Sequence, residues 1–286
     1  MKSLKIGMVH PGAMGISLAA SAQNSGHAVY WVSEGRSTQT QARAAEHNLI
    51  EVPSLEELGD ICSVIICVCP PYAAEEVARE IVQSSFDGLY LDANAISPQR
   101  AIRIGRLMDK AGVTFVDGGI IGGPAWETGR TCLYLSGEDA ERVTTCFSGG
   151  PLETSIIGED IGKASALKMC FAAYTKGTTA LLCAILAVAE ELGVRTDLQN
   201  QWSRDGSDFA DQAASRARRV TAKAWRFAGE MDEIAATFAG AGMPAGFHEA
   251  AGDVYRRIAH FKEEPDQPAL EEVLDALLST GERDKS

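Results

Sequence analysis

The chain has 286 residues, with 26 Lys and Arg against 39 Asp and Glu, which gives a formal charge of −13 at pH 7. Such an acidic chain repels nucleic acid and anionic membranes on average, so we expect neither as a partner. Its 45% hydrophobic and 23% charged residues are typical of a globular protein. The length predicts two domains, because one domain usually takes about 100–200 residues.

The seven cysteines lie mostly in apolar runs and show neither Cys-x-x-Cys pairs nor the Cys and His spacing of a zinc site. We therefore expect reduced, buried thiols and no bound metal. The N-terminus lacks the apolar stretch of a signal peptide. The longest uncharged apolar run, residues 177–189, is shorter than the ~20 residues that cross a bilayer. These features predict a cytoplasmic protein.

Short apolar runs alternate with helical patterns through the first 157 residues. The predicted strands are 4–9, 28–32, 49–52, 63–68, 89–92, 113–117 and 131–135. The predicted helices are 13–25, 38–47, 73–83 and 98–111. Gly26 follows the first helix where a left-handed residue belongs, and Ser97 before Pro98 is typical of a helix start. The alternation predicts an α/β, doubly wound (Rossmann) parallel sheet with helices on both faces.

Beyond residue 157 the pattern becomes entirely helical. One helix is predicted over 162–192, which is far longer than the mean of about 11–12 residues. Further helices are predicted over 197–204, 208–230, 231–240 and 247–261, followed by a polar tail at 281–286. The sequence thus predicts an α/β domain over 1–157 and an all-helical domain over 158–286. The apolar surface of these helices also predicts a homodimer.

The segment His10-Pro11-Gly12-Ala13-Met14-Gly15 directly follows the first strand and opens the first helix. This is the place of the Gly-x-Gly-x-x-Gly turn, whose second glycine lets a diphosphate approach and whose third allows close packing of helix on strand. Gly12 and Gly15 fit these two roles, whereas His10 replaces the first glycine. Free N–H groups at the helix start would bind the phosphates. The alternative is an ordinary tight turn.

The second predicted strand ends in Ser33-Glu34-Gly35-Arg36-Ser37, where the adenosine ribose of a dinucleotide would lie. An inward Glu34 would bind the 2′-hydroxyl of NAD. Ser33, Arg36 and Ser37 would instead hold the 2′-phosphate of NADP, because a guanidinium binds phosphate with two hydrogen bonds. This grouping favours NADP and leaves NAD as the alternative. A solvated turn without a ligand is the third interpretation.

Four segments, in order, resemble the β-hydroxyacid dehydrogenase superfamily, which includes 6-phosphogluconate and 3-hydroxyisobutyrate dehydrogenases. Residues 7–15 look like its glycine motif, and 92–98 look like its Asp-x-Ser-Thr-x-Ser-Pro segment. Residues 116–124 stand in the place of its substrate-binding turn, and 161–168 end in its catalytic lysine. The chain looks closer to a less-characterised branch of phosphogluconate-dehydrogenase-like, NADP-binding proteins. The resemblance implies a dinucleotide-binding domain over 1–157 and a substrate and dimerisation domain over 158–286.

The resemblance also implies hydride transfer between the nicotinamide and a small hydroxyl or oxo compound, with Lys168 as the general acid and base. Apolar neighbours on the long helix would bury the Lys168 ammonium and lower its pKa into the working range. The predicted cofactor-binding residues are His10, Pro11, Gly12, Ala13, Met14, Gly15, Ser33, Arg36, Ser37, Cys69, Pro70 and Asn94. The predicted substrate-binding residues are Asn94, Gly122, Gly123 and Lys168.

The chain departs from the superfamily pattern at three places. Asn94 and Ala95 replace Ser-Thr, Ile121 replaces a serine, and Phe171 with Ala172 replaces an asparagine pair. Two alternatives therefore stay open: an imine-reducing dehydrogenase, whose charged iminium needs fewer polar contacts, and a non-catalytic NADP(H)-binding protein. The sequence assigns no role to Trp126, Arg130, Arg226, Glu230 and His248.

Overall fold

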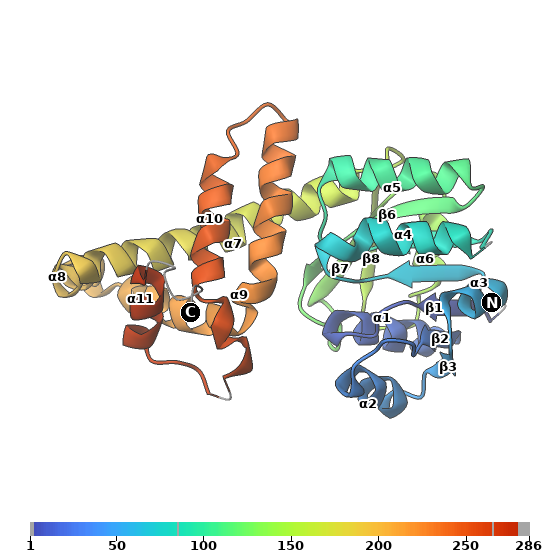
Figure 1. The fold of residues 1–286 in the computed structure, drawn as a ribbon, viewed down its shortest axis with the longest axis horizontal. Coiled ribbons are helices and arrows are strands. Elements are labelled where there is room, and N and C mark those ends of the chain that lie inside the picture. Colours follow the sequence, from blue (N-terminus) through green and yellow to red (C-terminus); the bar gives the residue numbers. More distant parts are fainter. Residues whose placement is uncertain (1–2, 85, 265, 280–286) are drawn as a thin grey trace, which may run out of the picture. The chain divides into compact units, whose positions relative to one another are not determined.

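The computed structural model describes residues 3–84, 86–264 and 266–279 (Figure 1). The chain divides into two compact units, Met1–Met169 and Cys170–Ser286, so the division falls inside one long helix. The sequence placed a domain boundary at residue 157, and that functional boundary stays a prediction. The predicted tail at 281–286 lies outside the described residues.

The first unit is built on an eight-stranded sheet in the order β3-β2-β1-β4-β5-β6-β7-β8. Its strands are β1 Lys5–Met8, β2 Ala28–Val32, β3 Ile50–Val52, β4 Val64–Cys67, β5 Leu89–Asp92, β6 Thr114–Gly122, β7 Thr131–Ser136 and β8 Glu153–Gly158. The pairs from β3 to β6 are parallel, β7 is antiparallel to β6, and β8 is parallel to β7. The doubly wound sheet is therefore confirmed, and a reversed pair of strands extends it.

The helices of this unit are α1 Ala13–Asn24, α2 Thr38–Glu46, α3 Leu55–Ile61, α4 Ala74–Gln83, α5 Pro98–Lys110 and α6 Ala140–Thr145, with a 3-10 turn, η1, at Pro71–Ala73. Helices α3 and α6 and strand β8 were not predicted. The two helices span 7 and 6 residues, about two turns, and β8 is half exposed along its length. None of the three shows a full apolar period. Gly26 does adopt the predicted left-handed conformation, with φ +85°.

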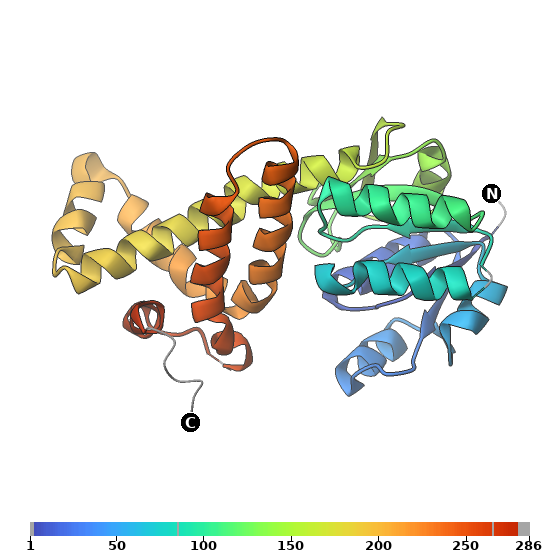
Figure 2. The same ribbon diagram turned by 45° about the horizontal axis from the view of Figure 1, so that its top comes forward.

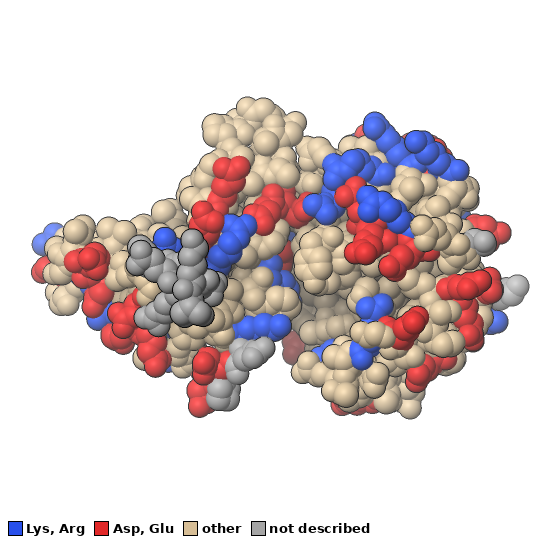
Figure 3. All heavy atoms as spheres, in the orientation of Figure 1, with Lys and Arg blue, Asp and Glu red and all other residues tan. Residues whose placement is uncertain are grey.

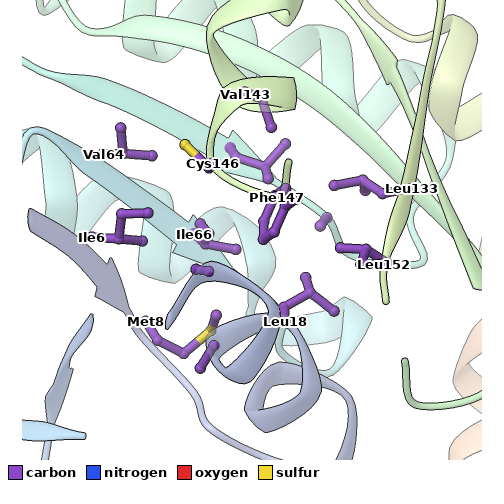
Figure 4. Close-up of a cluster of buried hydrophobic side chains, with 14 of the residues drawn as sticks. Ile6, Met8, Leu18, Val64, Ile66, Leu133, Val143, Cys146, Phe147 and Leu152 are labelled. Carbon is purple, nitrogen blue, oxygen red and sulfur yellow. The ribbon is translucent and has the colours of Figure 1, made fainter. Parts of the chain in front are cut away.

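Two apolar cores lie on the two faces of the sheet. Helices α4 and α5 lie side by side over one face (Figures 1 and 2), and α3 packs there too. On the other face, Leu18 of α1 and Val143 of α6 pack with Phe147 against the sheet residues Ile6 and Ile66 (Figure 4). Burying each such side chain stabilises the fold by about 1.5–3 kcal/mol. These cores fix the carboxyl ends of the strands at one edge.

The second unit is helical in its described residues. Its elements are the end of α7 Lys163–Glu191, α8 Arg195–Trp202, η2 Arg204–Gly206, α9 Phe209–Gly240, α10 Gly246–Arg257, η3 Ala259–Glu263 and α11 Leu270–Leu278. The predicted break at residues 230 and 231 is wrong, because α9 continues through it. The charge of Glu230 interrupts the apolar pattern of the sequence, which suggested a helix end. In the structure Glu230 is buried, and its carboxylate pairs with the ammonium of Lys176 inside the unit. Helix α11 was missed, and the predicted helix 247–261 ends at Arg257.

Helix α7 is long and apolar enough to cross a membrane, by length and composition alone. The core helices of globular proteins meet the same criterion, and 56% of the apolar stretch of α7 is buried within the protein. This helix is longer than the uncharged run at 177–189, because it also includes residues on both sides of that run.

The seven cysteines are all free, in agreement with the predicted reduced thiols. The expectation that they are buried holds for four of them and is wrong for Cys170, which is exposed. The buried ones are Cys62, Cys67, Cys146 and Cys183, and the half-buried ones are Cys69 and Cys132.

Charged side chains of both signs meet on the outer helices of the sheet. Figure 3 shows basic side chains over α5 beside acidic side chains over α4. Arg103 Nε donates to Glu75 Oε1 at 3.0 Å, and Arg100 Nη1 lies 4.0 Å from the other oxygen of the same carboxylate. These positive charges are therefore partly neutralised by their neighbours.

Candidate active site

The turn between β1 and α1 has the geometry that the two glycines predict. A Cβ atom on Gly15 would lie 2.2 Å from the carbonyl oxygen of His10, so only glycine lets α1 pack this closely. A Cβ on Gly12 would meet nothing within 4 Å. Gly12 is also the N-cap residue of α1, where no side chain caps the helix and no acidic residue occupies the first turn. The turn thus offers open space and free N–H donors to an anion.

His10 and Arg36 lie together at the same edge of the sheet. Both side chains are half-buried, and His10 Nδ1 and Arg36 Nε have no hydrogen-bond partner among the described residues. Burial, together with the positive charge of Arg36, lowers the pKa of His10 to about 4. Burial also lowers the pKa of Arg36, against the opposing charge of Glu80. The structure therefore brings these two predicted residues together and leaves their nitrogen atoms available.

The two predicted serines beside Arg36 have partners within the protein. Ser33 Oγ donates to the carbonyl oxygen of Val52 at 3.4 Å. Ser37 is the N-cap of α2, where its hydroxyl oxygen accepts from Thr40 N at 3.3 Å. The structure thus gives both hydroxyls local partners, and of the predicted trio only Arg36 carries a charge that acts on His10.

Asn94 joins the carboxyl ends of β4 and β5. Its Oδ1 accepts from Cys69 N at 2.5 Å, and its Nδ2 donates to Cys67 Sγ at 3.4 Å. Its own N–H donates to Asp92 Oδ1 at 3.0 Å. The adjacent Pro70 is the residue before η1. Most of the hydrogen-bonding capacity of the Asn94 amide is therefore used inside the protein, and the residue positions the loop that carries Cys69 and Pro70.

Asp92 is a buried carboxyl group that the sequence analysis did not single out. It is 1% exposed, and its Oδ2 has no hydrogen-bond partner among the described residues. Burial raises the pKa of Asp92 to about 7, while the hydrogen bond from Asn94 opposes the shift. The only feature of the sequence that pointed to this residue is its place at the end of an apolar strand, β5.

Lys168 lies on the second turn of α7, which packs directly on β6. A Cβ on Gly119 of β6 would lie 2.5 Å from the carbonyl oxygen of Ala164 and 3.0 Å from Lys168 Cβ. Gly119 therefore allows the helix to approach the strand and holds Lys168 just past the last residue pair of β5 and β6. Lys168 is half-buried. The apolar enclosure predicted for it is wrong in part, because Leu167 is 36% exposed.

A buried carboxylate, Asp117, fixes the start of α7. Its Oδ2 accepts from Gly162 N, Ser165 N and Ser136 Oγ, each at 3.0 Å, and its Oδ1 accepts from Ser165 Oγ at 2.6 Å. Burial raises the pKa of Asp117, and these hydrogen bonds oppose the shift. This role was not predicted, because the donors lie 19 to 48 residues away from Asp117 along the chain.

The predicted glycines of a substrate-binding turn lie where β6 ends, with Gly122 as its last residue and Gly123 as the first residue of the following loop. Gly122 has φ +127°, and a Cβ there would lie 2.4 Å from Arg130 O. The carbonyl oxygen of Gly123 accepts from Thr131 Oγ1 at 2.7 Å. Both glycines are exposed, and a Cβ on Gly123 would meet nothing within 4 Å. Their backbone is therefore exposed to solvent and is held in place by the hydrogen bond from Thr131.

The residues without a predicted role all have partners inside the protein. Trp126 stacks on His47 with 5.3 Å between ring centroids, and Arg130 lies 3.4 Å from Glu127. In the helical unit, buried His248 packs against Phe238 with 4.2 Å between centroids. Arg226 lies 3.9 Å from Glu230, whose other oxygen pairs with Lys176. This buried Lys176–Glu230 pair joins residues 54 positions apart and was not predicted.

Residues 5–147, half of the chain, match the model of the NAD binding domain of 6-phosphogluconate dehydrogenase. The chain belongs to the β-hydroxyacid dehydrogenase superfamily. Residues 189–258 match a domain of unknown function, DUF1932. The resemblance drawn from the motifs is thereby confirmed.

Two proteins without an assigned activity are similar to this chain in sequence. An uncharacterized 28.5 kDa protein of Methanothermus fervidus is 30% identical over 185 residues, which cover 64% of this chain and 70% of that protein. A conserved protein of unknown function, whose structure is described as similar to 3-hydroxyacid dehydrogenases, is 30% identical with TM-score 0.67, over 89% of this chain and 98% of that chain.

Two enzymes of known activity share the fold. The 3-hydroxyisobutyrate dehydrogenase of Mycobacterium tuberculosis is 18% identical with TM-score 0.69, over 97% of this chain and 100% of that chain. The imine reductase of Myxococcus stipitatus, solved in complex with NADP+, is 17% identical with TM-score 0.56, over 96% of this chain and 100% of that chain.

A nicotinamide dinucleotide fits the carboxyl edge of the sheet by its chemistry. The open space at Gly12 and the uncapped start of α1 suit a diphosphate, as do the unpartnered nitrogen atoms of His10 and Arg36. The residues at this edge thus fit the group that the matched NAD binding domain implies.

Gly15→Ala is expected to lower the free energy of unfolding by about 1–3 kcal/mol, because the added Cβ overpacks the turn. Gly12→Ala, the matched control, is expected to change it by less than about 0.5 kcal/mol, since its Cβ has room. Urea unfolding followed by circular dichroism measures both. Equal losses in the two variants would contradict the packing role of Gly15.

Asp92 is expected to make stability depend on pH. Its pKa of about 7 in the folded protein exceeds the unfolded value near 3.9, so the folded state holds the extra proton between these values. The free energy of unfolding of the wild type should therefore fall, relative to Asp92→Asn, by up to about 1.4 kcal/mol per pH unit from about pH 5 to pH 7.

Urea unfolding at several pH values measures this difference. Asp60→Asn, which changes an exposed carboxylate of α3, is the matched control and should follow the wild type. Parallel curves for wild type and Asp92→Asn would show that Asp92 is ionised in the folded protein.

Proposed function

We propose that this protein is an NADP-dependent oxidoreductase that transfers hydride between the nicotinamide and a small hydroxyl or oxo compound of hydroxyacid type, with Lys168 as the general acid and base. The observation that carries the proposal is the placement of Lys168 directly over Gly119, just past the paired ends of β5 and β6. Doubly wound folds bind their ligands at this edge. The similarity to 3-hydroxyisobutyrate dehydrogenases supports the substrate class.

The bound dinucleotide would supply the hydride donor or acceptor. Gly12 and the start of α1 would bind its diphosphate, and Arg36 would bind a phosphate on the adenosine ribose. In the direction of reduction, Lys168 would donate a proton to the substrate oxygen as negative charge develops there. In the direction of oxidation, it would accept the hydroxyl proton. The Asp117 hydrogen bonds would keep the helix, and with it this amine, in position.

Gly122 and Gly123 would bind an anionic group of the substrate through backbone N–H donors. Their exposure supports this, since a substrate must reach them from solvent. Asn94 would contribute by positioning the loop after β4, because most of its amide already bonds to Cys69 and Cys67.

The preference for NADP is supported by Arg36. Its Nε is buried without a partner, and charge-assisted hydrogen bonds from a guanidinium to phosphate are worth about 1.5–3 kcal/mol. Ser33 and Ser37 add little to this preference, because their hydroxyls bond to the protein itself.

Arg36→Ala is expected to weaken NADPH binding by roughly tenfold or more, and NADH binding much less, because only NADPH carries the 2′-phosphate. Titration followed by nicotinamide fluorescence measures both affinities. Arg142→Ala removes an exposed arginine that pairs with Asp139, and it should bind both as the wild type does. An equal loss for the two dinucleotides would remove the NADP assignment.

Lys168→Ala is expected to lower turnover by roughly 10²–10⁴-fold while NADPH affinity stays within about twofold, because the change removes proton transfer and leaves the dinucleotide site intact. The assay follows NADPH absorbance with a panel of small oxo acids. Lys163→Ala, on the same helix and exposed, is the matched control. Full activity in Lys168→Ala would exclude the role given to this lysine.

Imine reduction is a second candidate. It is favoured by the engaged amide of Asn94 and by the loss of the superfamily's polar residues at 95, 121 and 171, since an iminium already carries the charge that polar contacts would otherwise induce. The similarity to imine reductases is compatible with either substrate. Turnover of cyclic imines compared with that of oxo acids separates the two candidates.

A further inference from the structure

The structure leaves two buried nitrogen atoms unpaired at one edge of the sheet. They are Nδ1 of His10 and Nε of Arg36, which have no hydrogen-bond partner in the described part of the chain. His10 follows β1 and Arg36 follows β2, and these two strands pair in parallel, so both residues lie at the carboxyl edge. An unpaired buried polar atom costs about 1–3 kcal/mol. Such a cost points to a ligand that pairs with both nitrogens.

The surroundings of His10 are mainly positive. Arg36 is the charged group that acts on it most directly. Arg43 of α2 donates from Nη1 to the carbonyl oxygen of the next residue, Pro11, at 3.3 Å. The negative or titratable groups that act on Arg36 in turn come from α4 and from the end of β4, and they are Glu80, Cys67 and Cys69. The positive surroundings favour an anionic ligand.

The free protein keeps His10 neutral. Burial and the charge of Arg36 lower its pKa to about 4, so the imidazole is uncharged at neutral pH. A phosphate placed between the two side chains reverses this balance. Its negative charge compensates Arg36, and its oxygen atoms accept hydrogen bonds from both nitrogens.

We propose that His10 binds a phosphate of the dinucleotide as an imidazolium, so that the protein takes up a proton from solvent when the dinucleotide binds. This inference rests on the dinucleotide binding proposed above. The shared chemistry is a phosphate oxygen, and its two sources are the 2′-phosphate beside Arg36 and the diphosphate beside Gly12. The histidine that replaces the first glycine of the turn thereby makes cofactor affinity depend on pH.

The direction of this dependence follows from linkage. The imidazole pKa is about 4 in the free protein and higher in the complex, so protonation and binding favour each other between the two values. Affinity is greatest at low pH and falls by up to about tenfold per pH unit as pH rises toward the pKa in the complex. Above that pKa the affinity no longer changes.

Isothermal titration calorimetry of NADP+ and NAD+ tests this proposal. Measurements from about pH 5 to pH 8, in buffers of different ionisation enthalpy, give the affinity and the number of protons taken up. The variant is His10→Asn, which keeps a polar side chain without a titratable charge. His260→Asn, which removes an exposed histidine of η3, is the matched control. The 2′-phosphate of NADP+ titrates near pH 6 itself, so the readout is the difference between variant and wild type.

We expect the wild type and His260→Asn to take up a fraction of a proton when they bind the dinucleotide near pH 5–6. His10→Asn should lack this uptake. After correction for this phosphate, the wild type should bind more tightly at pH 5 than at pH 8, by up to about tenfold per pH unit below the imidazole pKa in the complex. A difference with both dinucleotides identifies the diphosphate as the partner, and one with NADP+ alone identifies the 2′-phosphate.

Equal proton uptake and equal pH profiles in the wild type and His10→Asn would overturn the proposal, while binding itself would persist. Absence of binding by either dinucleotide at every pH would instead overturn the proposed function. His10→Gly restores the usual glycine of the turn and serves as the second variant. It should bind both dinucleotides without the pH dependence, and a pH dependence retained in it would also exclude His10.

Discussion

The candidate active site depends on the hydrogen bonds that the buried carboxylate of Asp117 accepts. These bonds come from Ser136 of β7 and from Gly162 and Ser165 at the start of α7. A carboxylate at the N-terminus of a helix accepts hydrogen bonds from its free N–H groups and compensates the positive end of the helix dipole. Because Asp117 lies on β6, two strands and a helix meet at one carboxyl group.

That junction sets the position of Lys168. The helix begins where Asp117 binds it, and Gly119, two residues further along β6, lets the next turn approach the strand. A Cβ on Gly119 would lie 2.5 Å from the carbonyl oxygen of Ala164, so a larger residue would push the helix away from the strand. The backbone of the sheet therefore determines the position of the Lys168 side chain, and the buried hydrogen bonds of Asp117 support that position.

The carboxyl edge of the sheet combines satisfied and unsatisfied polar groups. Asn94, Ser33 and Ser37 bond to neighbouring loops and give the edge a fixed shape. His10 and Arg36, beside the uncapped start of α1, keep nitrogen atoms without partners among the described residues. The polar groups left without partners at this edge are thus few in the part of the chain that the structure describes, and the guanidinium of Arg36 and the start of α1 are the donors among them that suit phosphate.

The sequence by itself determined the alternation of strands and helices, the glycine turn and the long α7, because each rests on residues close together in the chain. It also determined the superfamily, through motifs that keep their order. The short α3 and α6 and the half-exposed β8 lacked a full apolar period. Only the tertiary structure decided which polar residues act together. The groups that hydrogen-bond to the side chains of Asp117 and Asn94 lie 19 to 48 residues away along the chain. Burial, which sets the pKa of Asp92 and His10, exists only once the chain has folded.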